Sequence, residues 1–226
     1  MVRTGATGTS APDGRLSRPD RQDALLDTAA ALLEAGGASA VTMEAVAANA
    51  GVSRPLVYKH FTNRDALMVA LFRRESAAFD AEVAEALADV EGLEALIRVS
   101  AEAIVDGFAR RRRVLRPLLR GESMNAGLRQ AQFERNRRHH RWYRDRVVAE
   151  RGVAPDVAEA VVTVFFGGLS ALIATSPARP GPEERRRTVD VCVAMTMGGL
   201  DRLATAAETA AGAADGDGEA AETGQG

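Results

Sequence analysis

Residues 42–64 read TMEAVAANAGVSRPLVYKHFTNR, and this stretch decides the fold of the N-terminal part of the chain. Thr42 and Ser53 each stand where a short helix would begin, and both residue types are favoured helix N-caps. The tripeptide Ala50-Gly51-Val52 between the two segments predicts a tight turn. The small residues Ala47 and Gly51 would let the two helices cross closely. The apolar seam between them would consist of Val46, Val52, Val57 and Phe61. The stretch therefore predicts a helix-turn-helix.

The second of these helices carries side chains suited to DNA. If Val57 and Phe61 point into the seam, helical spacing turns Pro55 and Lys59 outward. Arg54 lies in the first turn, where a recognition helix meets base edges, and its guanidinium can contact guanine O6 and N7. The Pro55 ring can pack on a thymine methyl group. Four residues can contact phosphates, although each alone would be an ordinary surface residue: Thr42, Tyr58, His60 and Arg64.

The pattern on both sides of this stretch is also helical. Apolar residues recur at helical spacing, Gly36-Gly37 and Pro180 interrupt the pattern, and no segment shows the alternation of a strand. We expect an all-α fold of about nine helices, with further helices at about 23–36, 63–89, 92–111, 113–120, 124–151, 155–175 and 183–206.

The two ends of the 226-residue chain differ from its middle. Residues 1–17 and 207–226 contain no periodic apolar pattern, and five acids but no base follow Leu203. Such segments do not bury enough apolar surface to offset their ordering entropy. The sequence thus predicts a disordered tail at 1–17, a DNA-binding domain at 18–62, a helical domain at 63–206 and a disordered acidic tail at 207–226.

The sequence also bears on the compartment. Cys192 is the only cysteine and has no partner for an internal disulfide, and residues 1–20 lack the apolar core of a signal peptide. We expect a cytoplasmic protein that associates with the nucleoid when it binds DNA.

The uncharged run from Ala160 to Ala178 is long enough to span a membrane. Its glycines, hydroxyl residues and proline favour a helix buried in a subunit interface, with no membrane partner.

Residues 20–75 resemble the N-terminal domain of TetR-family transcriptional regulators. The resemblance rests on Thr42, on Ala50-Gly51-Val52-Ser53, on Val57-Tyr58-Lys59-His60-Phe61 and on Thr62-Asn63-Arg64-Asp65-Ala66-Leu67. It implies three helices for DNA binding and six for a dimerising, ligand-binding core. It also implies DNA contacts at Thr42, Ser53, Arg54, Pro55, Leu56, Tyr58, Lys59, His60 and Arg64. Pro55 and Leu56 replace the small residues common at these positions, which affects the operator sequence.

Charges are segregated in the rest of the chain. Residues 75–109 carry a net charge of −8, and residues 110–151 carry a net charge of +10 with fourteen arginines. One interpretation is that the two segments are neighbours and exchange surface ion pairs. The other is that Arg110–Arg113 or Arg135–Arg146 binds an anionic effector such as an acyl-CoA.

Aromatic residues suggest where an effector would bind. Adjacent His139 and His140 face about 100° apart on a helix, so they do not readily share a metal ion, and we expect no metal site. Ordinary packing is the alternative for each aromatic residue singly. The candidate wall of an effector pocket consists of Phe108, Met124, Phe133, His139, Trp142, Phe165 and Phe166.

Two glycine pairs interrupt the last two helices. Each mid-helix glycine costs about 1 kcal/mol relative to alanine, and close approach of another helix is the usual compensation. A kink beside a ligand is the alternative. The resemblance implies that the last two helices form a four-helix bundle across a two-fold axis. The candidate dimer interface consists of Gly167, Gly168, Leu172, Met195, Gly198 and Gly199.

We therefore predict a homodimeric, ligand-responsive regulator of transcription. Its partners would be a double-stranded DNA operator and a small-molecule effector, and the expected mechanism is repression relieved when the effector releases the protein from a palindromic operator. A DNA-binding activator or nucleoid-type protein with the same head is the alternative. The sequence contains no nucleophile–base arrangement, metal-ligand spacing or phosphate loop, so we expect neither catalysis nor a cofactor.

Overall fold

The computed structural model describes residues 17–119, 125–175 and 181–222. These residues form two compact units, which divide between Leu67 and Met68. Eight α-helices and one short 3₁₀ turn make up the described part of the chain, which contains no strand. The all-α prediction is confirmed, and nine helices become eight because the predicted helices at 92–111 and 113–120 are one.

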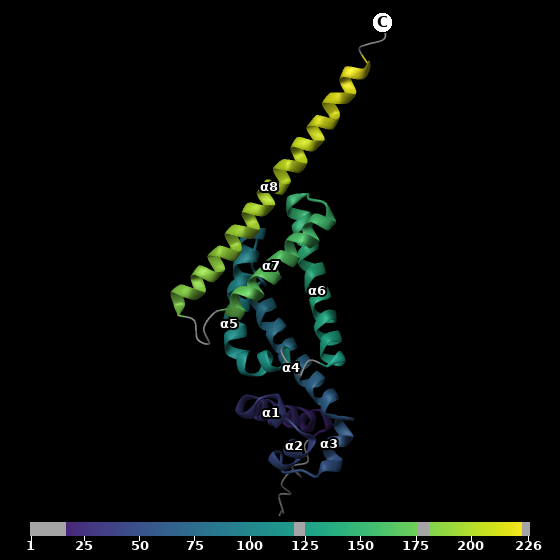
Figure 1. Cartoon of the computed structure of the whole chain (residues 1–226), viewed down its shortest axis with the longest axis vertical. Coiled ribbons are helices and arrows are strands. Elements are labelled where there is room, and N and C mark those ends of the chain that lie inside the picture. The colour runs from purple at the N-terminus through teal and green to yellow at the C-terminus, as the bar shows by residue number, and fades with distance from the viewer. Residues whose placement is uncertain (1–16, 120–124, 176–180, 223–226) are drawn as a thin grey trace, which may run out of the picture. The chain divides into compact units, whose positions relative to one another are not determined.

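The first unit contains three helices that pack together (Figure 1): α1 (Arg18–Gly36), α2 (Met43–Asn49) and α3 (Arg54–His60). A capping box at Ser17 and Asp20 starts α1, because each side chain bonds the other residue's backbone N–H. Helix α1 therefore begins five residues before the predicted start at Asp23. Its buried face consists of Leu25, Leu26, Ala29 and Leu33.

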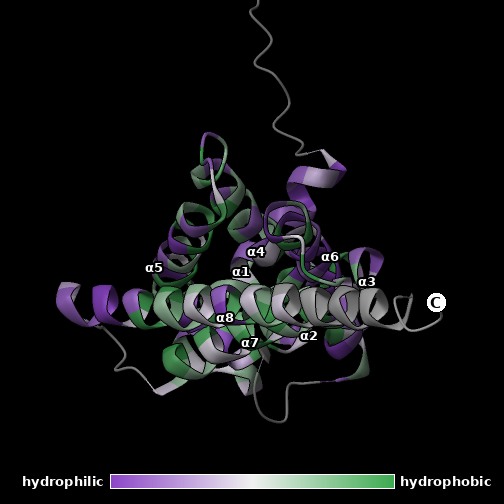
Figure 2. Ribbon diagram, turned by 90° about the horizontal axis from the view of Figure 1, so that it is seen from above, coloured by the Kyte–Doolittle hydropathy of each residue, from purple (hydrophilic) through white to green (hydrophobic). Residues whose placement is uncertain are grey.

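Helix α4 (Arg64–Ala86) begins in the first unit and continues into the second. The second unit further contains α5 (Leu93–Leu119), α6 (Ala126–Arg151), α7 (Pro155–Thr175) and α8 (Pro182–Glu222). Pro117 lies inside the last turns of α5. Helix α8 continues to Glu222, beyond the predicted end near residue 206. Its C-terminal part extends beyond the other helices of the second unit (Figure 1). Figure 2 shows that α8 begins with hydrophilic residues, which correspond to Glu183–Arg187.

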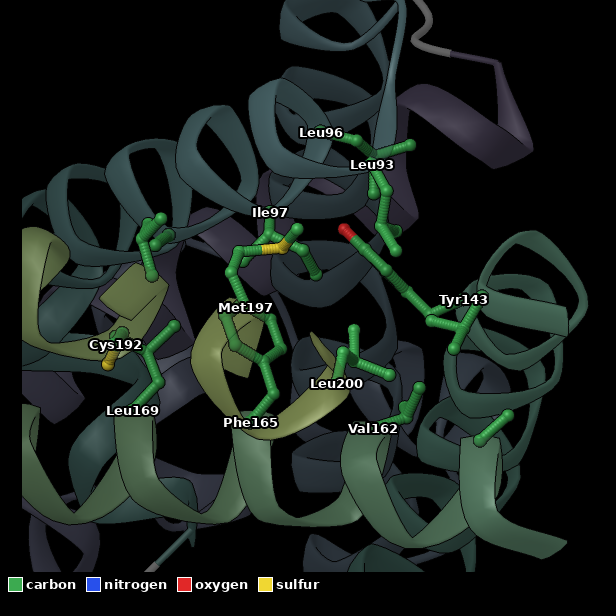
Figure 3. Close-up of a cluster of buried hydrophobic side chains, with 14 of the residues drawn as sticks. Leu93, Leu96, Ile97, Tyr143, Val162, Phe165, Leu169, Cys192, Met197 and Leu200 are labelled. Atoms are coloured by element: carbon green, nitrogen blue, oxygen red, sulfur yellow. The ribbon is translucent and has the colours of Figure 1, made fainter. Parts of the chain in front are cut away.

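The core of the second unit is formed where α5, α6, α7 and α8 meet (Figure 3). Ile97, Phe165 and Leu200 are examples of its fully buried side chains. The hydroxyl of Tyr143 lies in this core, 2.7 Å from the Ser100 hydroxyl. Burial raises the pKa of Tyr143, so the pair stays neutral and satisfies its hydrogen bonds internally.

The segregated charges meet across helices. Glu82 of α4 accepts hydrogen bonds from Arg111 and Arg110 of α5, and these bonds lower the pKa of Glu82 to about 2. Asp80 accepts from Arg135 of α6, with 3.0 Å between Nε and Oδ1. The interpretation that the acidic and basic segments exchange ion pairs is thereby confirmed at these residues. Other arginines of α6 remain outside these pairs.

Candidate nucleic-acid interface

Helices α2 and α3 form the helix-turn-helix. Oγ1 of Thr42 accepts a hydrogen bond from the backbone N–H of Ala45 at 3.0 Å, which caps α2. Gly51 turns the chain with φ of 65°, a left-handed conformation that glycine adopts without strain. Val46, Ala47, Val57 and Phe61 are buried, as predicted, whereas Val52 of the predicted seam is half-buried. Their packing fixes the side of α3 that stays exposed.

The exposed side of α3 carries the predicted DNA contacts. Ser53, Arg54, Pro55, Tyr58 and Lys59 are exposed, with 46% of Tyr58 accessible. Leu56 and His60 are half-buried. Ser53 occupies the N-cap position, but its side chain makes no capping hydrogen bond. Its hydroxyl is thus available to a phosphate, and the Thr42 hydroxyl can also donate its O–H to one, because the bond from Ala45 occupies only a lone pair of its oxygen.

Two arginines have partners within the first unit. Arg54 forms an ion pair with Glu44 of α2, and this pair must open before Arg54 can reach a base. Arg64 donates from Nε to the Val41 carbonyl at 2.7 Å and from Nη2 to the Ala38 carbonyl at 2.6 Å. Arg64 therefore holds the segment before α2 in place. These two bonds use two of the five N–H donors of the guanidinium, and those on Nη1 and the second N–H of Nη2 remain for the predicted phosphate contact.

Two further arginines belong to this basic surface, and the sequence reasoning missed them. Burial is the largest cause that lowers the pKa of His60, followed by the charges of Arg18, Lys59 and Arg21. Neither Arg18 nor Arg21 has an ion pair among the described residues. The start of α1 thus adds two positive charges beside the end of α3. The signal in the sequence was the basic pair on either side of Pro19-Asp20, but the position of this pair relative to α3 depends on tertiary packing.

The described residues of the predicted effector pocket differ in burial and in their neighbours. Phe165 is buried in the core, while Phe133 and Trp142 are exposed by 56% and 46%. Nε2 of His139 lies 3.3 Å from Oδ2 of Asp80. Burial would raise the pKa of Asp80, but hydrogen bonds from His139 and Arg135 bring it below its ordinary value. Phe108 is half-buried, and Met124 lies outside the described residues.

A groove lies between α6 and α7, with a volume of about 610 Å³. Among the described residues of the predicted pocket, Phe133 lines this groove. Phe166 stacks on the lining residue His140, with 5.3 Å between ring centroids. The groove is rich in arginine, and sequence reasoning found its chemistry only as a basic run. The lining residues are Phe133, Asn136, Arg137, His140, Arg141, Arg144, Pro155, Asp156 and Glu159.

The predicted dimer-interface residues lie on exposed faces of α7 and α8. Among them, Gly167, Gly168 and Gly198 are exposed, and Met195 is exposed by 70%. Leu172 and Gly199 are half-buried. A Cβ added at any of the four glycines would have no neighbouring atom within 4 Å. Packing within one chain therefore does not require these glycines.

Helix α7 also has an unusual composition for an exposed position. It is the one described helix that is long and apolar enough to cross a membrane, with a mean hydropathy of 2.0 over its most apolar window. Only 22% of that window is buried in the chain. Val164 alone is 66% exposed. Such an apolar surface indicates a partner that covers it.

Residues 25–71 match the family model described as bacterial regulatory proteins, tetR family. The chain is 36% identical over 94 residues to the HTH-type transcriptional regulator EthR of Mycolicibacterium smegmatis, covering 38% of this chain and 43% of that protein. It is 32% identical over 92 residues to the HTH-type transcriptional activator FasR of the same organism, covering 41% and 42%. The matches thus span less than half the length of these relatives.

The likeness in fold extends further than the likeness in sequence. The crystal structure of AibR in complex with isovaleryl coenzyme A and operator DNA superposes with a TM-score of 0.60 at 18% identity. The match covers 77% of this chain and 97% of that one. The family match and the helix-turn-helix show that residues 25–71 form a tetR-family helix-turn-helix domain, and the structural likeness shows that the chain shares its all-α fold with solved regulators of this type.

Proposed function

We propose that the protein is a homodimeric repressor that binds a palindromic DNA operator and leaves it when a small-molecule effector binds. The exposed face of α3, with Arg54, Pro55, Tyr58 and Lys59 above a buried seam, carries the DNA-binding part of the proposal. Arg54 is assigned to base recognition, and Ser53, Tyr58 and His60 to phosphates. Because burial and neighbouring cations lower its pKa, His60 acts as a neutral N–H donor at pH 7.

A dimer follows from the requirements of the operator and from the exposed faces of α7 and α8. One α3 helix reads only a half-site, and two related by a two-fold axis read a palindrome when they are about 34 Å apart. The open space above Gly167, Gly168 and Gly198 would let a second copy approach closely. Effector binding would then shift the population toward a dimer whose α3 helices do not span adjacent major grooves.

An effector is supported by the tetR-family domain and by one solved neighbour, AibR, which was crystallised in complex with isovaleryl coenzyme A and operator DNA. The alternative direction of control, activation, has its own support because the relative FasR is named an activator. An operator that overlaps the promoter of its target gene would favour repression. We infer a cytoplasmic regulator without catalytic activity, whose DNA-bound form associates with the nucleoid.

Selection of bound sequences from random duplex DNA tests the DNA-binding proposal. We expect a palindrome whose half-site centres are about one helical turn apart. No enrichment of any sequence would refute the proposal.

Tyr58→Phe should weaken binding to the selected operator and to scrambled DNA by about the same factor, because the missing hydroxyl is assigned to a phosphate and the ring is kept. Fluorescence anisotropy measures both affinities. A loss of affinity confined to one operator variant would show that Tyr58 reads bases.

A salt titration tests the contribution of α1. The double substitution Arg18→Ala and Arg21→Ala should reduce the slope of log affinity against log salt by about 0.9 for each phosphate that the variant no longer neutralises. Because this interaction is nonspecific, a duplex of any sequence suffices. Arg186→Ala with Arg187→Ala is the matched control, since it removes two exposed arginines from the first turns of α8. Equal slopes for both variants and the parent would remove α1 from the DNA interface.

A further inference from the structure

The groove between α6 and α7 has one basic wall. Arg137, Arg141 and Arg144 lie four and three residues apart, so they share one face of α6 and follow each other at about one turn, or ~5.4 Å. Arg137 and Arg141 are exposed and form no ion pair within the described residues. Arg144 is paired with its neighbour Asp145 at 2.7 Å. Two guanidinium groups in a row therefore face the groove without an anion.

The opposite wall, from the first turns of α7, is acidic. It contains Pro155, Asp156 and Glu159, and Glu159 lies 3.5 Å from Nδ1 of His140. This wall would repel a simple anion and accept hydrogen bonds from a donor. At one end of the groove lies the exposed ring of Phe133, with the Arg137 guanidinium 5.7 Å from its centroid. A planar ring could stack there.

We propose that this groove binds a small molecule that combines a diphosphate group with hydrogen-bond donors, as a nucleoside diphosphate does. Each arginine presents a planar fork of N–H donors that matches phosphate oxygens. A row of cations one turn apart fits a ligand with successive negative charges, whereas a single carboxylate would occupy only one arginine. Ribose hydroxyls or a base amino group would bond to Asp156 and Glu159, and the base would stack on Phe133.

Two kinds of natural ligand carry this chemistry, namely nucleotides and coenzyme A derivatives, because both contain an adenosine diphosphate moiety. The role of such a ligand as the effector rests on the proposed function, but its binding to the groove does not. Binding is therefore measured on the full chain without DNA. A protein that binds operator but none of these ligands would refute only the groove proposal.

Isothermal titration calorimetry with ADP, coenzyme A, inorganic pyrophosphate and adenosine is the direct test. We expect ADP and coenzyme A to bind, pyrophosphate to bind at least about tenfold more weakly because it lacks donors, and adenosine to bind weakest because it lacks charge. Tighter binding of coenzyme A than of ADP would identify the coenzyme as the source, and equal binding would identify the shared nucleotide part. Trp142, the only tryptophan and next to Arg141, gives an independent fluorescence readout.

Arginine variants assign the binding to the groove. Arg137→Ala with Arg141→Ala should weaken ADP binding by about a hundredfold, at roughly tenfold for each charge-assisted contact. Arg138→Ala is the matched control, because Arg138 is exposed on the same helix and does not line the groove. Circular dichroism checks that each variant keeps its helices. The proposal is overturned if neither ADP nor coenzyme A binds, if pyrophosphate binds as well as both, or if Arg138→Ala weakens binding as much as the double variant.

Discussion

Gly168→Glu should convert the protein into a monomer that has lost most of its affinity for operator DNA. In the proposed dimer, this position meets α7 or α8 of a second copy. Burying an unpaired carboxylate there costs several kcal/mol or forces its protonation. The DNA-binding unit would remain folded in the monomer, but it would present a single α3 helix. Half-site contacts alone would leave only weak binding.

A substitution at Gly168 can test the proposed interface without disturbing the fold of the single chain. Gly168 is exposed, and a Cβ at this position has open space around it, so the glutamate should not disturb its own chain. Replacing a glycine within a helix also improves helix propensity. The substitution should therefore leave the thermal stability of the isolated chain unchanged or slightly raised. Loss of the dimer would then be an interface effect and not a folding defect.

Sedimentation velocity beside an operator titration measures both consequences. Ala149→Glu is the matched control, because it adds the same charge at an exposed position of α6. Gly168→Ala separates size from charge and should weaken the dimer less than the glutamate does. If the Gly168→Glu protein stays dimeric and binds operator normally, the interface lies elsewhere, and the exposed apolar surface of α7 needs another cover. Partition of the full chain into lipid vesicles would then identify that cover as a membrane.

The helix-turn-helix could be predicted from sequence because its determinants are local. The Thr42 cap, the turn at Gly51 and the buried positions Val57 and Phe61 all lie within twenty residues of each other, and the structure confirms them. The side chains of Arg54 and Arg64 were harder to place. Their partners, Glu44 and the carbonyls of Val41 and Ala38, come from the preceding helix and loop.

The predicted helix ends were wrong where local helix propensity and tertiary context favour different structures. Pro117 lies inside the single helix α5, two residues before its end at Leu119, although the expected break lay near residue 112. The alanine-rich segment after Leu203 favours helix, and α8 continues through it to Glu222 although it lacks large apolar residues. The prediction that the helix ends near residue 206 weighed the lack of large apolar residues above the helix propensity of alanine.

The residues that line the groove between α6 and α7 could not be predicted as a group, because their grouping depends on contacts between helices. Phe165 and Phe166 are neighbours in sequence, yet one is buried in the core and the other stacks on His140 of α6. The basic run in α6 was visible, but the division of its arginines was not. Arg135 pairs with Asp80 of α4, whereas Arg137 and Arg141 face the groove.

Arg54→Ala should abolish the discrimination between operator and mutated half-sites at one base pair. A bidentate arginine–guanine contact contributes about 1–3 kcal/mol of discrimination, so the ratio of specific to nonspecific affinity should fall by roughly 5- to 150-fold for each half-site. Binding to scrambled DNA should change little, because phosphate contacts supply it. Anisotropy titrations with operator and scrambled duplexes measure the ratio, and an unchanged ratio would exclude Arg54 from base recognition.

The ion pair between Arg54 and Glu44 provides a second, independent test of the same contact. About half of each side chain is exposed, so the pair contributes only ~0–1 kcal/mol and opens easily. Glu44→Gln should therefore tighten operator binding by a few fold, since it frees Arg54 and removes a negative charge that faces phosphates. In the background of Arg54→Ala, the same substitution should retain only the smaller effect of its charge. A double-mutant cycle measures this difference. If Glu44→Gln acts equally with and without Arg54, the two residues are not coupled on DNA, and Arg54 does not leave Glu44 to read a base.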